Sequence, residues 1–162
     1  MDSDADVLSW NIKELSKALK INESEVKEYF TDGRRVSFLL ERRLAHEILH
    51  GNLAKSEGED FDVSDNEGNR WEVRSISKDG VYFCPSYMVG SGRNFEEKGF
   101  LKKLNNIKGY ILADIANFPD IPFWMVSSEE VRQWWDGRKL GTTTKISRKK
   151  AITLLGSKQS IN

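Results

Sequence analysis

Apolar residues recur along the chain with two different periods, and the first of these is helical. Leu8–Leu19 carries apolar residues at helical spacing, and Asn22 is a good N-cap for a second helix that ends at Phe30. A third helix is predicted over Val36–Leu53, because its apolar residues form one broad face. The chain therefore begins with helices.

After these helices the pattern becomes that of strands. Phe61–Ser64 and Arg70–Ser77 surround the turn Asp65–Asn69, which predicts a β-hairpin, and Val81–Tyr87 predicts a third strand. Beyond it we expect a helix over Phe95–Ile107, strands over Tyr110–Ile115 and Pro122–Val126, and a helix over Ser128–Trp135. This order favours an α/β protein with a mixed central β-sheet flanked by helices, preceded by an N-terminal helical segment.

The length of 162 residues is that of one domain, with an N-terminal helical segment at 1–35 and the main domain at 36–162 in one compact unit. No apolar run is long enough to span a membrane, and the acidic N-terminus lacks the features of a signal peptide, so we expect a cytoplasmic protein. Cys84, the only cysteine, lies in an apolar run and is expected to be buried and structural.

The 25 basic and 25 acidic residues balance, but they are unevenly placed. The first thirty residues carry seven acids, whereas the segment Arg138–Asn162 has seven basic residues and no acid. Two interpretations stay open for this basic segment: a solvated surface, or a surface that contacts phosphates.

Two carboxylates flank the predicted hairpin turn. Asp62 and Glu72 can face one another across the two strands. Carboxylate oxygens held together bind hard divalent cations such as Mg²⁺. In phosphodiester hydrolysis such an ion polarises the phosphate and lowers the pKa of the attacking water. The hairpin is therefore the candidate catalytic segment.

This segment resembles the signature of the PD-(D/E)xK nucleases, the superfamily of many type II restriction endonucleases: an acidic residue, a turn, and Glu-x-Lys on the next strand. The resemblance covers about Asp62–Ile76, with a looser agreement in element order over Val36–Trp135. It implies a restriction-endonuclease-like core, Mg²⁺ held by Asp62, Glu72 and the carbonyl of Val73, and site-specific cleavage of double-stranded DNA. It also implies a cognate DNA methyltransferase in the same system. Cutting both strands with one site per chain calls for two chains, so we expect a homodimer.

The sequence departs from this signature at one position, where Arg74 replaces the lysine. Arginine can hold a phosphate but stays protonated, so it cannot act as a general base. We expect Arg74 to support the phosphate, with Lys78 as a possible substitute cation. In related nucleases the preceding helix often contributes a catalytic acid, for which Glu47 is the first choice and Glu41 the alternative.

The segment that follows the hairpin is rich in groups that contact DNA. Arginine can read guanine and asparagine can read adenine, while glycines permit close approach of the backbone. The candidate DNA-binding residues are Tyr87, Ser91, Gly92, Arg93, Asn94 and Lys98. The alternative is an ordinary strand-to-helix loop in which Asn94 caps the helix.

Two other functions compete with the nuclease. His46–His50 matches H-E-x-x-H, in which two histidines of one helical face bind zinc, but a metalloprotease would need a third ligand such as Asp62, Glu72 or Asp114. The missing signature lysine also fits a non-catalytic DNA-binding protein or subunit on the same fold. In that protein Trp134 and Trp135 would be interface anchors, unless they pack in the core.

Overall fold

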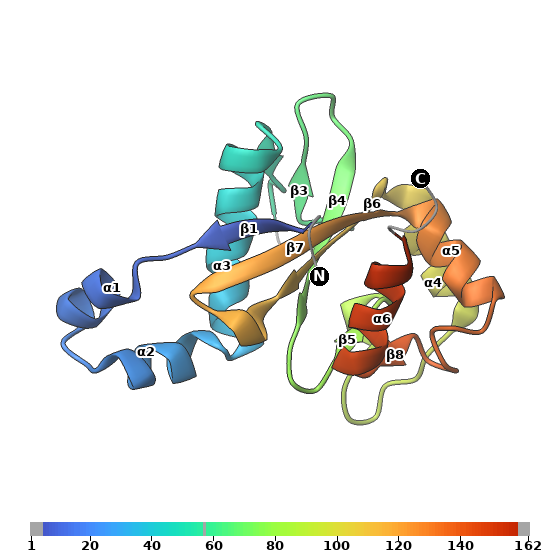
Figure 1. The fold of residues 1–162 in the computed structure, drawn as a ribbon. Coiled ribbons are helices and arrows are strands. Elements are labelled where there is room, and N and C mark those ends of the chain that lie inside the picture. Colours follow the sequence, from blue (N-terminus) through green and yellow to red (C-terminus); the bar gives the residue numbers. More distant parts are fainter. Residues whose placement is uncertain (1–4, 57, 159–162) are drawn as a thin grey trace.

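The computed structural model describes residues 5–56 and 58–158, which form a mixed α/β protein (Figure 1). Its six-stranded sheet has the order β1-β7-β6-β4-β3-β2, and β5 pairs with β8 in a separate ribbon. Strands β4 and β6 are parallel, whereas the other neighbours in the six-stranded sheet are antiparallel. The predicted mixed sheet with flanking helices is confirmed.

The strands of the six-stranded sheet are β1 (Asp6–Ser9), β2 (Asn52–Leu53), β3 (Val63–Ser64), β4 (Arg70–Ile76), β6 (Gly109–Asp114) and β7 (Asp120–Ser127), and the ribbon strands are β5 (Val81–Tyr82) and β8 (Lys145–Ile146). The α-helices are α1 (Ile12–Leu19), α2 (Glu23–Phe30), α3 (Gly33–Arg43), α4 (Glu97–Asn106), α5 (Ser128–Asp136) and α6 (Arg148–Lys158). Shorter helical turns are η1 (Leu44–Ile48), η2 (Ser86–Met88) and η3 (Ile115–Asn117).

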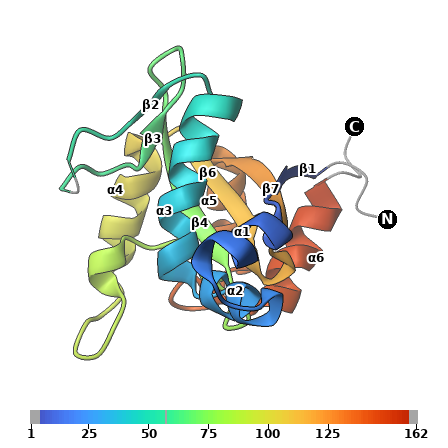
Figure 2. The same ribbon diagram turned by 90° about the vertical axis from the view of Figure 1, so that its left-hand side faces the viewer.

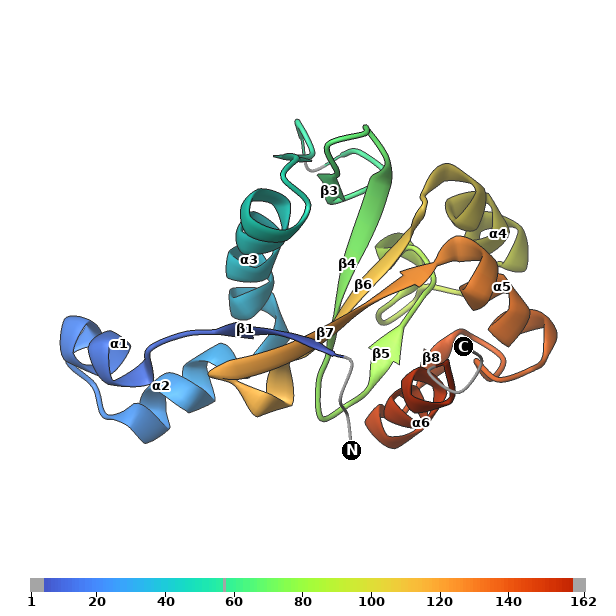
Figure 3. The same ribbon diagram turned by 45° about the horizontal axis from the view of Figure 1, so that its top comes forward.

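The two faces of the sheet carry separate apolar cores, because successive residues of a strand point in opposite directions. Figure 3 shows α3 on one side of β4 and β6, with α4, α5 and α6 on the other. On β4, Val73 joins the core beneath α3, whereas Ile76 joins the core beneath α4, α5 and α6. The same alternation places the side chains of Glu72 and Arg74 on the face of the sheet that α4 covers.

The N-terminal residues correct one prediction. Residues 6–9 form strand β1 along β7, and the helix begins only at Ile12. Asn11 ends the strand and caps this helix, because its side chain accepts a hydrogen bond from the backbone N–H of Glu14 at 3.1 Å. Leu8 is buried in the sheet rather than in a helix face. Its spacing from Ile12 suits a helix, but Leu8 instead lies opposite Ile121 of β7.

The third helix ends earlier than predicted. Helix α3 continues through the wider turn η1, after which His50 takes a left-handed φ of 48° and Asn52–Leu53 forms β2. Gly51 lies so close to the backbone of Ser64 that an added Cβ would be 1.9 Å from the Ser64 carbonyl oxygen. This close approach turns the chain away from the helix and into the sheet.

The predicted third strand is also shorter than expected. Only Val81–Tyr82 is a strand, and it pairs with β8 instead of extending the large sheet. The backbone N–H of Cys84 then donates to the hydroxyl of Thr144 at 2.8 Å, which takes the chain out of strand geometry. Strand β8 and helix α6 have no counterpart in the predictions. The other predicted elements, α2, the β3–β4 hairpin, α4, β6, β7 and α5, are confirmed.

The N-terminal segment belongs to the same body as the rest of the chain. Strand β1 forms the edge beside β7, and the ring of Phe30 on α2 stacks on Phe118 with centroids 5.1 Å apart.

In the described residues, no helix has both the length and the apolar character needed to cross a membrane.

Candidate functional site

The site begins at an uncovered edge of strand β4. Strand β3 pairs only with Arg70 and Trp71, so no strand among the described residues pairs with β4 on that side from Glu72 onward. The backbone N–H of Val73 points to this edge and donates to Oδ2 of Asp62 at 2.8 Å. In an extended strand the carbonyl of a residue points to the same side as its N–H, so the carbonyl of Val73 also faces this edge.

Asp62 and Glu72 come together there, as the hairpin predicts. Burial raises the pKa of Asp62 to about 6, and the negative charge of Glu72 adds to this. The N–H of Val73 and the cations Arg74 and Lys103 oppose the shift. Glu72 is only 6% exposed. The structure thus holds two carboxylates close enough to disfavour the ionised form of Asp62.

Each oxygen of Glu72 has a cationic partner. Nη2 of Arg74 lies 3.1 Å from Oε1, and Nζ of Lys103 lies 2.7 Å from Oε2. Lys103 also donates to the carbonyl of Asp60, and its side chain is 10% exposed. The sequence analysis missed Lys103. It belongs to α4, thirty-one residues beyond Glu72, and only the packing of α4 against the sheet brings it to the hairpin.

Arg74 is fixed by one ion pair and two hydrogen bonds. Besides Glu72, its guanidinium donates to the hydroxyl of Tyr82 at 3.3 Å and to the carbonyl of Cys84 at 3.1 Å. Its Nε is buried and has no hydrogen-bond partner in the part of the chain that the structure describes. Cys84 is buried, as predicted, and its backbone carbonyl helps to hold Arg74.

Of the two acidic candidates on the preceding helix, Glu41 and not Glu47 lies beside Asp62 and Glu72. Glu41 and Asp62 line the same pocket of about 330 Å³. Burial raises the pKa of Glu41 to about 7, and the charge of Asp62 contributes. Glu47 faces solvent one and a half turns later and forms an ion pair with Arg43 at 2.9 Å. The structure therefore does not bring the first-choice residue to the site.

Two further residues of the hairpin region have positions outside the cluster. Lys78 is exposed on the turn that follows β4 and lines none of the pockets around Asp62. Asp65 organises the β3–β4 turn: its carboxylate accepts hydrogen bonds from the backbone of Glu67 and Asn69 and from the indole of Trp71. The acidic residue Asp65 thus has a structural role in the turn.

The candidate DNA-binding residues divide into two groups. Tyr87 is 65% exposed and lines a pocket of about 430 Å³ together with Asp62, Glu72 and Lys103. The others are exposed but do not line this pocket, and Figure 2 shows the loop before α4 projecting from the body. These residues are Ser91, Gly92, Arg93, Asn94 and Lys98.

Local contacts define this loop further. Arg93 donates to the carbonyls of Ser86 and Val89 at 3.4 and 3.3 Å, so its guanidinium folds back on its own loop. The N-cap position of α4 is Glu96, so Asn94 does not cap that helix. The alternative role suggested for Asn94 is therefore wrong.

The H-E-x-x-H segment does not form the expected helical pair. His46 lies in η1, whereas His50 follows the end of that turn with a left-handed φ of 48°. Asp114, a possible third ligand, is paired with Arg148 at 2.6 Å. Within residues 5–56 and 58–158, no group of three or more His, Cys, Asp or Glu side chains is arranged to hold a metal ion.

The remaining candidates lie elsewhere. Trp134 and Trp135 are half-buried and pack their rings against Phe83, Phe95 and Phe100. Three of the basic C-terminal residues border pockets: Lys145 lines one at β4, whereas Arg148 and Lys149 line another near β7. The side chain of Lys158 lies outside the described residues.

Comparison of the chain with protein-family models, with characterised proteins and with solved structures finds no match. The residues of the site are therefore the basis for any functional conclusion.

Proposed function

We propose that this protein is a Mg²⁺-dependent endonuclease that hydrolyses phosphodiester bonds of double-stranded DNA at Asp62 and Glu72. One observation carries the proposal: two carboxylates, Asp62 just before β3 and Glu72 on β4, meet at the open edge of β4, and the pKa of Asp62 is raised to about 6. Perturbed acids in a cleft are characteristic of functional sites. The element order around them also agrees with the nuclease signature that the sequence resembles.

The donor groups suit magnesium. Asp62, Glu72 and the carbonyl of Val73 offer only oxygen, which is the ligand type of hard cations. Mg²⁺ commonly uses one or two protein carboxylates and keeps waters or substrate phosphates as its other ligands. A divalent cation would also offset the burial and the repulsion by Glu72 that together raise the pKa of Asp62. When bound, it would polarise the phosphate and lower the pKa of the attacking water.

The chain itself supplies the cations that a phosphate needs. Lys103 carries a compact ammonium beside Glu72, in the same pocket as the exposed side chain of Lys102. We assign to Lys103 the charge that the nuclease signature places at position 74. It would stabilise negative charge that develops on the phosphate. Arg74, held by Tyr82 and the carbonyl of Cys84, would position Glu72 and Lys103.

Cleavage of both DNA strands would require a second site, so we include a homodimer in the proposal. We also propose the setting of a restriction system, with a cytoplasmic location and a cognate DNA methyltransferase. Size-exclusion chromatography with light scattering tests the dimer. A strictly monomeric protein on DNA would limit the activity to nicking.

The function is tested by incubating supercoiled plasmid with the protein in Mg²⁺, in Zn²⁺ alone, and in EDTA. Asp62→Asn removes one carboxylate of the site, and Asp136→Asn, at the exposed end of α5, is the matched control. We expect discrete fragments only with Mg²⁺, retained by the control and lost in Asp62→Asn. Cleavage that persists in Asp62→Asn would refute this assignment.

A non-catalytic DNA-binding protein is the second candidate, because both oxygens of Glu72 are already occupied by Arg74 and Lys103. Such a protein would bind duplex DNA and leave it intact in Mg²⁺. Duplex affinity would then be the same for the wild type and Asp62→Asn. The same plasmid experiment, read together with a binding assay, separates the two functions.

A further inference from the structure

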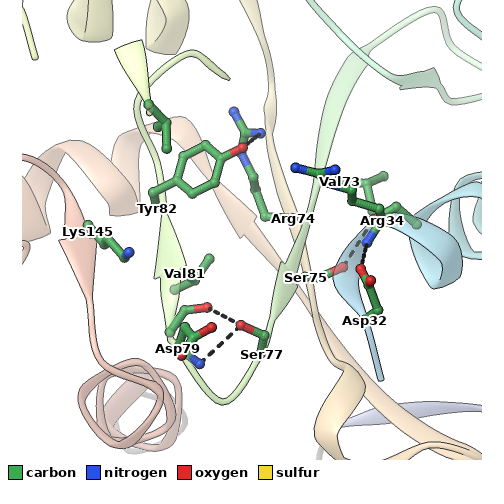
Figure 4. A pocket seen from close by; sticks show the side chains of 13 residues that line it. Asp32, Arg34, Val73, Arg74, Ser75, Ser77, Asp79, Val81, Tyr82 and Lys145 are labelled. Atoms are coloured by element: carbon green, nitrogen blue, oxygen red, sulfur yellow. Dashed lines mark hydrogen bonds between the residues drawn. The ribbon is translucent and has the colours of Figure 1, made fainter. Parts of the chain in front are cut away.

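A further pocket lies along β4, where Val73, Arg74 and Ser75 contribute to its lining. It has a volume of about 360 Å³ and lies between the start of α3, strand β4 and the β5–β8 ribbon. Figure 4 shows its side chains, with the hydroxyl of Tyr82 directed at the guanidinium of Arg74. We call it the Arg74 pocket.

Three elements contribute cations to the Arg74 pocket. Arg34 comes from α3, Arg74 from β4 and Lys145 from β8. Within the described residues, the side chains of Arg34 and Lys145 have no carboxylate within ion-pair distance. Arg74 is more than nine-tenths buried. The pocket thus combines one fixed cation with two that form no ion pair with the residues that the structure describes.

Acidic residues also line the pocket, and they do not cancel these charges. Asp32 caps α3 through the backbone N–H of Arg34 at 3.0 Å and forms an ion pair with Arg35 at 3.7 Å. Asp79 is exposed on the turn after β4. With Asp32 matched by Arg35, the groups that face the pocket leave an excess of positive charge.

The backbone of β4 adds an uncharged donor. The N–H of Val73 points to the open edge, so the N–H of Ser75, two residues later, points the same way. No backbone partner of Ser75 on this side occurs in the part of the chain that is described. Ser75, Ser77 and Tyr82 also present hydroxyl groups. Free amides, hydroxyls and cations together are the groups that bind phosphate oxygens.

We propose that the Arg74 pocket binds a phosphate of the nucleic-acid strand, next to the phosphate held at Asp62 and Glu72. This inference rests on the proposed function. The two positions are joined by β4: Val73 and Ser75 are two residues apart, which is about 6.6 Å in an extended strand. Successive phosphates along one DNA strand are separated by a similar distance. The pocket would therefore set the register of the strand on the enzyme.

A titration with inorganic phosphate tests the chemistry of the pocket without DNA or metal. Two-dimensional NMR follows the amide of Ser75 as phosphate replaces chloride at constant ionic strength. We expect a saturable shift, and an affinity at least tenfold weaker in the double variant Arg34→Ala, Lys145→Ala. The control, Arg132→Ala with Lys139→Ala, removes the same charge from exposed positions outside the pocket. A Ser75 signal that does not move, or that moves equally in the double variant, overturns the proposal.

Duplex binding in EDTA then tests the identity of the ligand. Each lost phosphate contact should reduce the slope of log affinity against log salt by about one, so the pocket variant, which loses one phosphate contact, should lose about one and the control none. If the pocket variant binds DNA like the control, the pocket proposal is wrong, even where plasmid cleavage shows that the nuclease assignment holds. If the wild type neither binds nor cleaves DNA, both are wrong, although the Ser75 titration would still establish an oxyanion site.

Discussion

The ammonium of Lys103 lies 2.7 Å from Oε2 of Glu72, although the rest of β4, strand β5, the turn η2 and most of α4 separate the two residues in the sequence. Arg74 takes the other oxygen of the same carboxylate at 3.1 Å. Arg74 has two further acceptors in the protein, whereas Lys103 faces the pocket that contains Asp62. Arg74 is therefore suited to positioning Glu72, and Lys103 to contacting a phosphate. Separate substitutions should distinguish these two roles.

Substitution Lys103→Ala should reduce the rate of DNA cleavage by about 10²–10³-fold, the usual loss when one group that stabilises transition-state charge is removed. The neighbouring variant Lys102→Ala is the control, since Lys102 lines the same pocket but has no contact with Glu72. It should weaken DNA binding and leave the cleavage rate of the bound complex nearly unchanged. Single-turnover kinetics at saturating protein separate the two effects.

Chemical rescue distinguishes the loss of the ammonium at position 103 from a folding defect caused by the substitution. Lys103→Cys can be alkylated with 2-bromoethylamine, which restores an ammonium, while the native Cys84 is buried and protected. Activity should return on alkylation. A Lys103→Cys protein that folds, is fully alkylated and stays inactive would contradict the role of the ammonium.

Substitution Arg74→Lys restores the signature residue but should not increase the rate of the proposed cleavage. A lysine cannot reach Glu72, Tyr82 and the carbonyl of Cys84 together, because it lacks the guanidinium fork. We expect a loss of about 1–3 kcal/mol in the free energy of unfolding and a lower cleavage rate. Urea denaturation and initial rates measure both. Unchanged stability with faster cleavage would instead make position 74 the catalytic cation.

The stability of the metal-free protein should fall as the pH rises from about 4 to 8. Asp62 and Glu41 have pKa values raised to about 6 and about 7, so the folded state binds more protons than the unfolded state over this range. One pKa unit corresponds to about 1.4 kcal/mol of unfolding free energy. Both side chains keep some contact with water, so solvent screening makes the effect smaller than the full shift. The variant Asp62→Asn should therefore gain about 1–2 kcal/mol at pH 8 in EDTA.

The measurement is urea denaturation at several pH values, with Asp136→Asn as the control that keeps the wild-type profile. The amide oxygen that Asp62→Asn introduces can still accept the hydrogen bond from Val73, so the substitution tests charge rather than the loss of that bond. A variant less stable than the wild type at pH 8 would show that the charge of Asp62 is compensated within the fold.

The ion pair between Asp114 and Arg148 should hold α6 on the sheet. Asp114 is 2% exposed and accepts from Nε and Nη2 of Arg148 at 3.1 and 2.6 Å. The substitution Arg148→Met leaves this carboxylate buried without its cation and should cost about 2–3 kcal/mol, less than a fully buried pair because Arg148 keeps contact with water. A double-mutant cycle with Asp114→Asn measures the coupling, and a coupling near zero would contradict this role.

Local chemistry made much of the fold predictable. Asn22 and Glu25 form the reciprocal cap of α2, and the Asp65 turn defines the hairpin that brings Asp62 to Glu72. Strand β1 was not predictable in this way, because Leu8 fits a helical period as well as a buried strand. Its pairing with Ile121 involves residues over a hundred positions apart.

The sequence carries a signal for Glu41, which ranks second to Glu47 in the sequence analysis, and for helix α6, which is not predicted there. Ser37 and Glu41 are one helical turn apart on α3, and the contact of Ser37 with Ser75 of β4 shows that this face looks toward the site. Glu47 falls on another face. Ala151, Leu154 and Leu155 have helical spacing within the basic C-terminal segment, and their burial explains α6. For Lys103 no local signal exists, since Lys102 beside it differs only in the direction set by packing.

The central claim, that Asp62 and Glu72 hold a catalytic divalent cation, is tested most directly by Mn²⁺ binding to the DNA-free protein, followed by electron paramagnetic resonance. The wild type and Asp136→Asn should bind the ion at one saturable site, and Asp62→Asn should lose at least 90% of that affinity, about 1.4 kcal/mol or more. Equal binding by Asp62→Asn and the wild type, or no binding by either, would contradict the account.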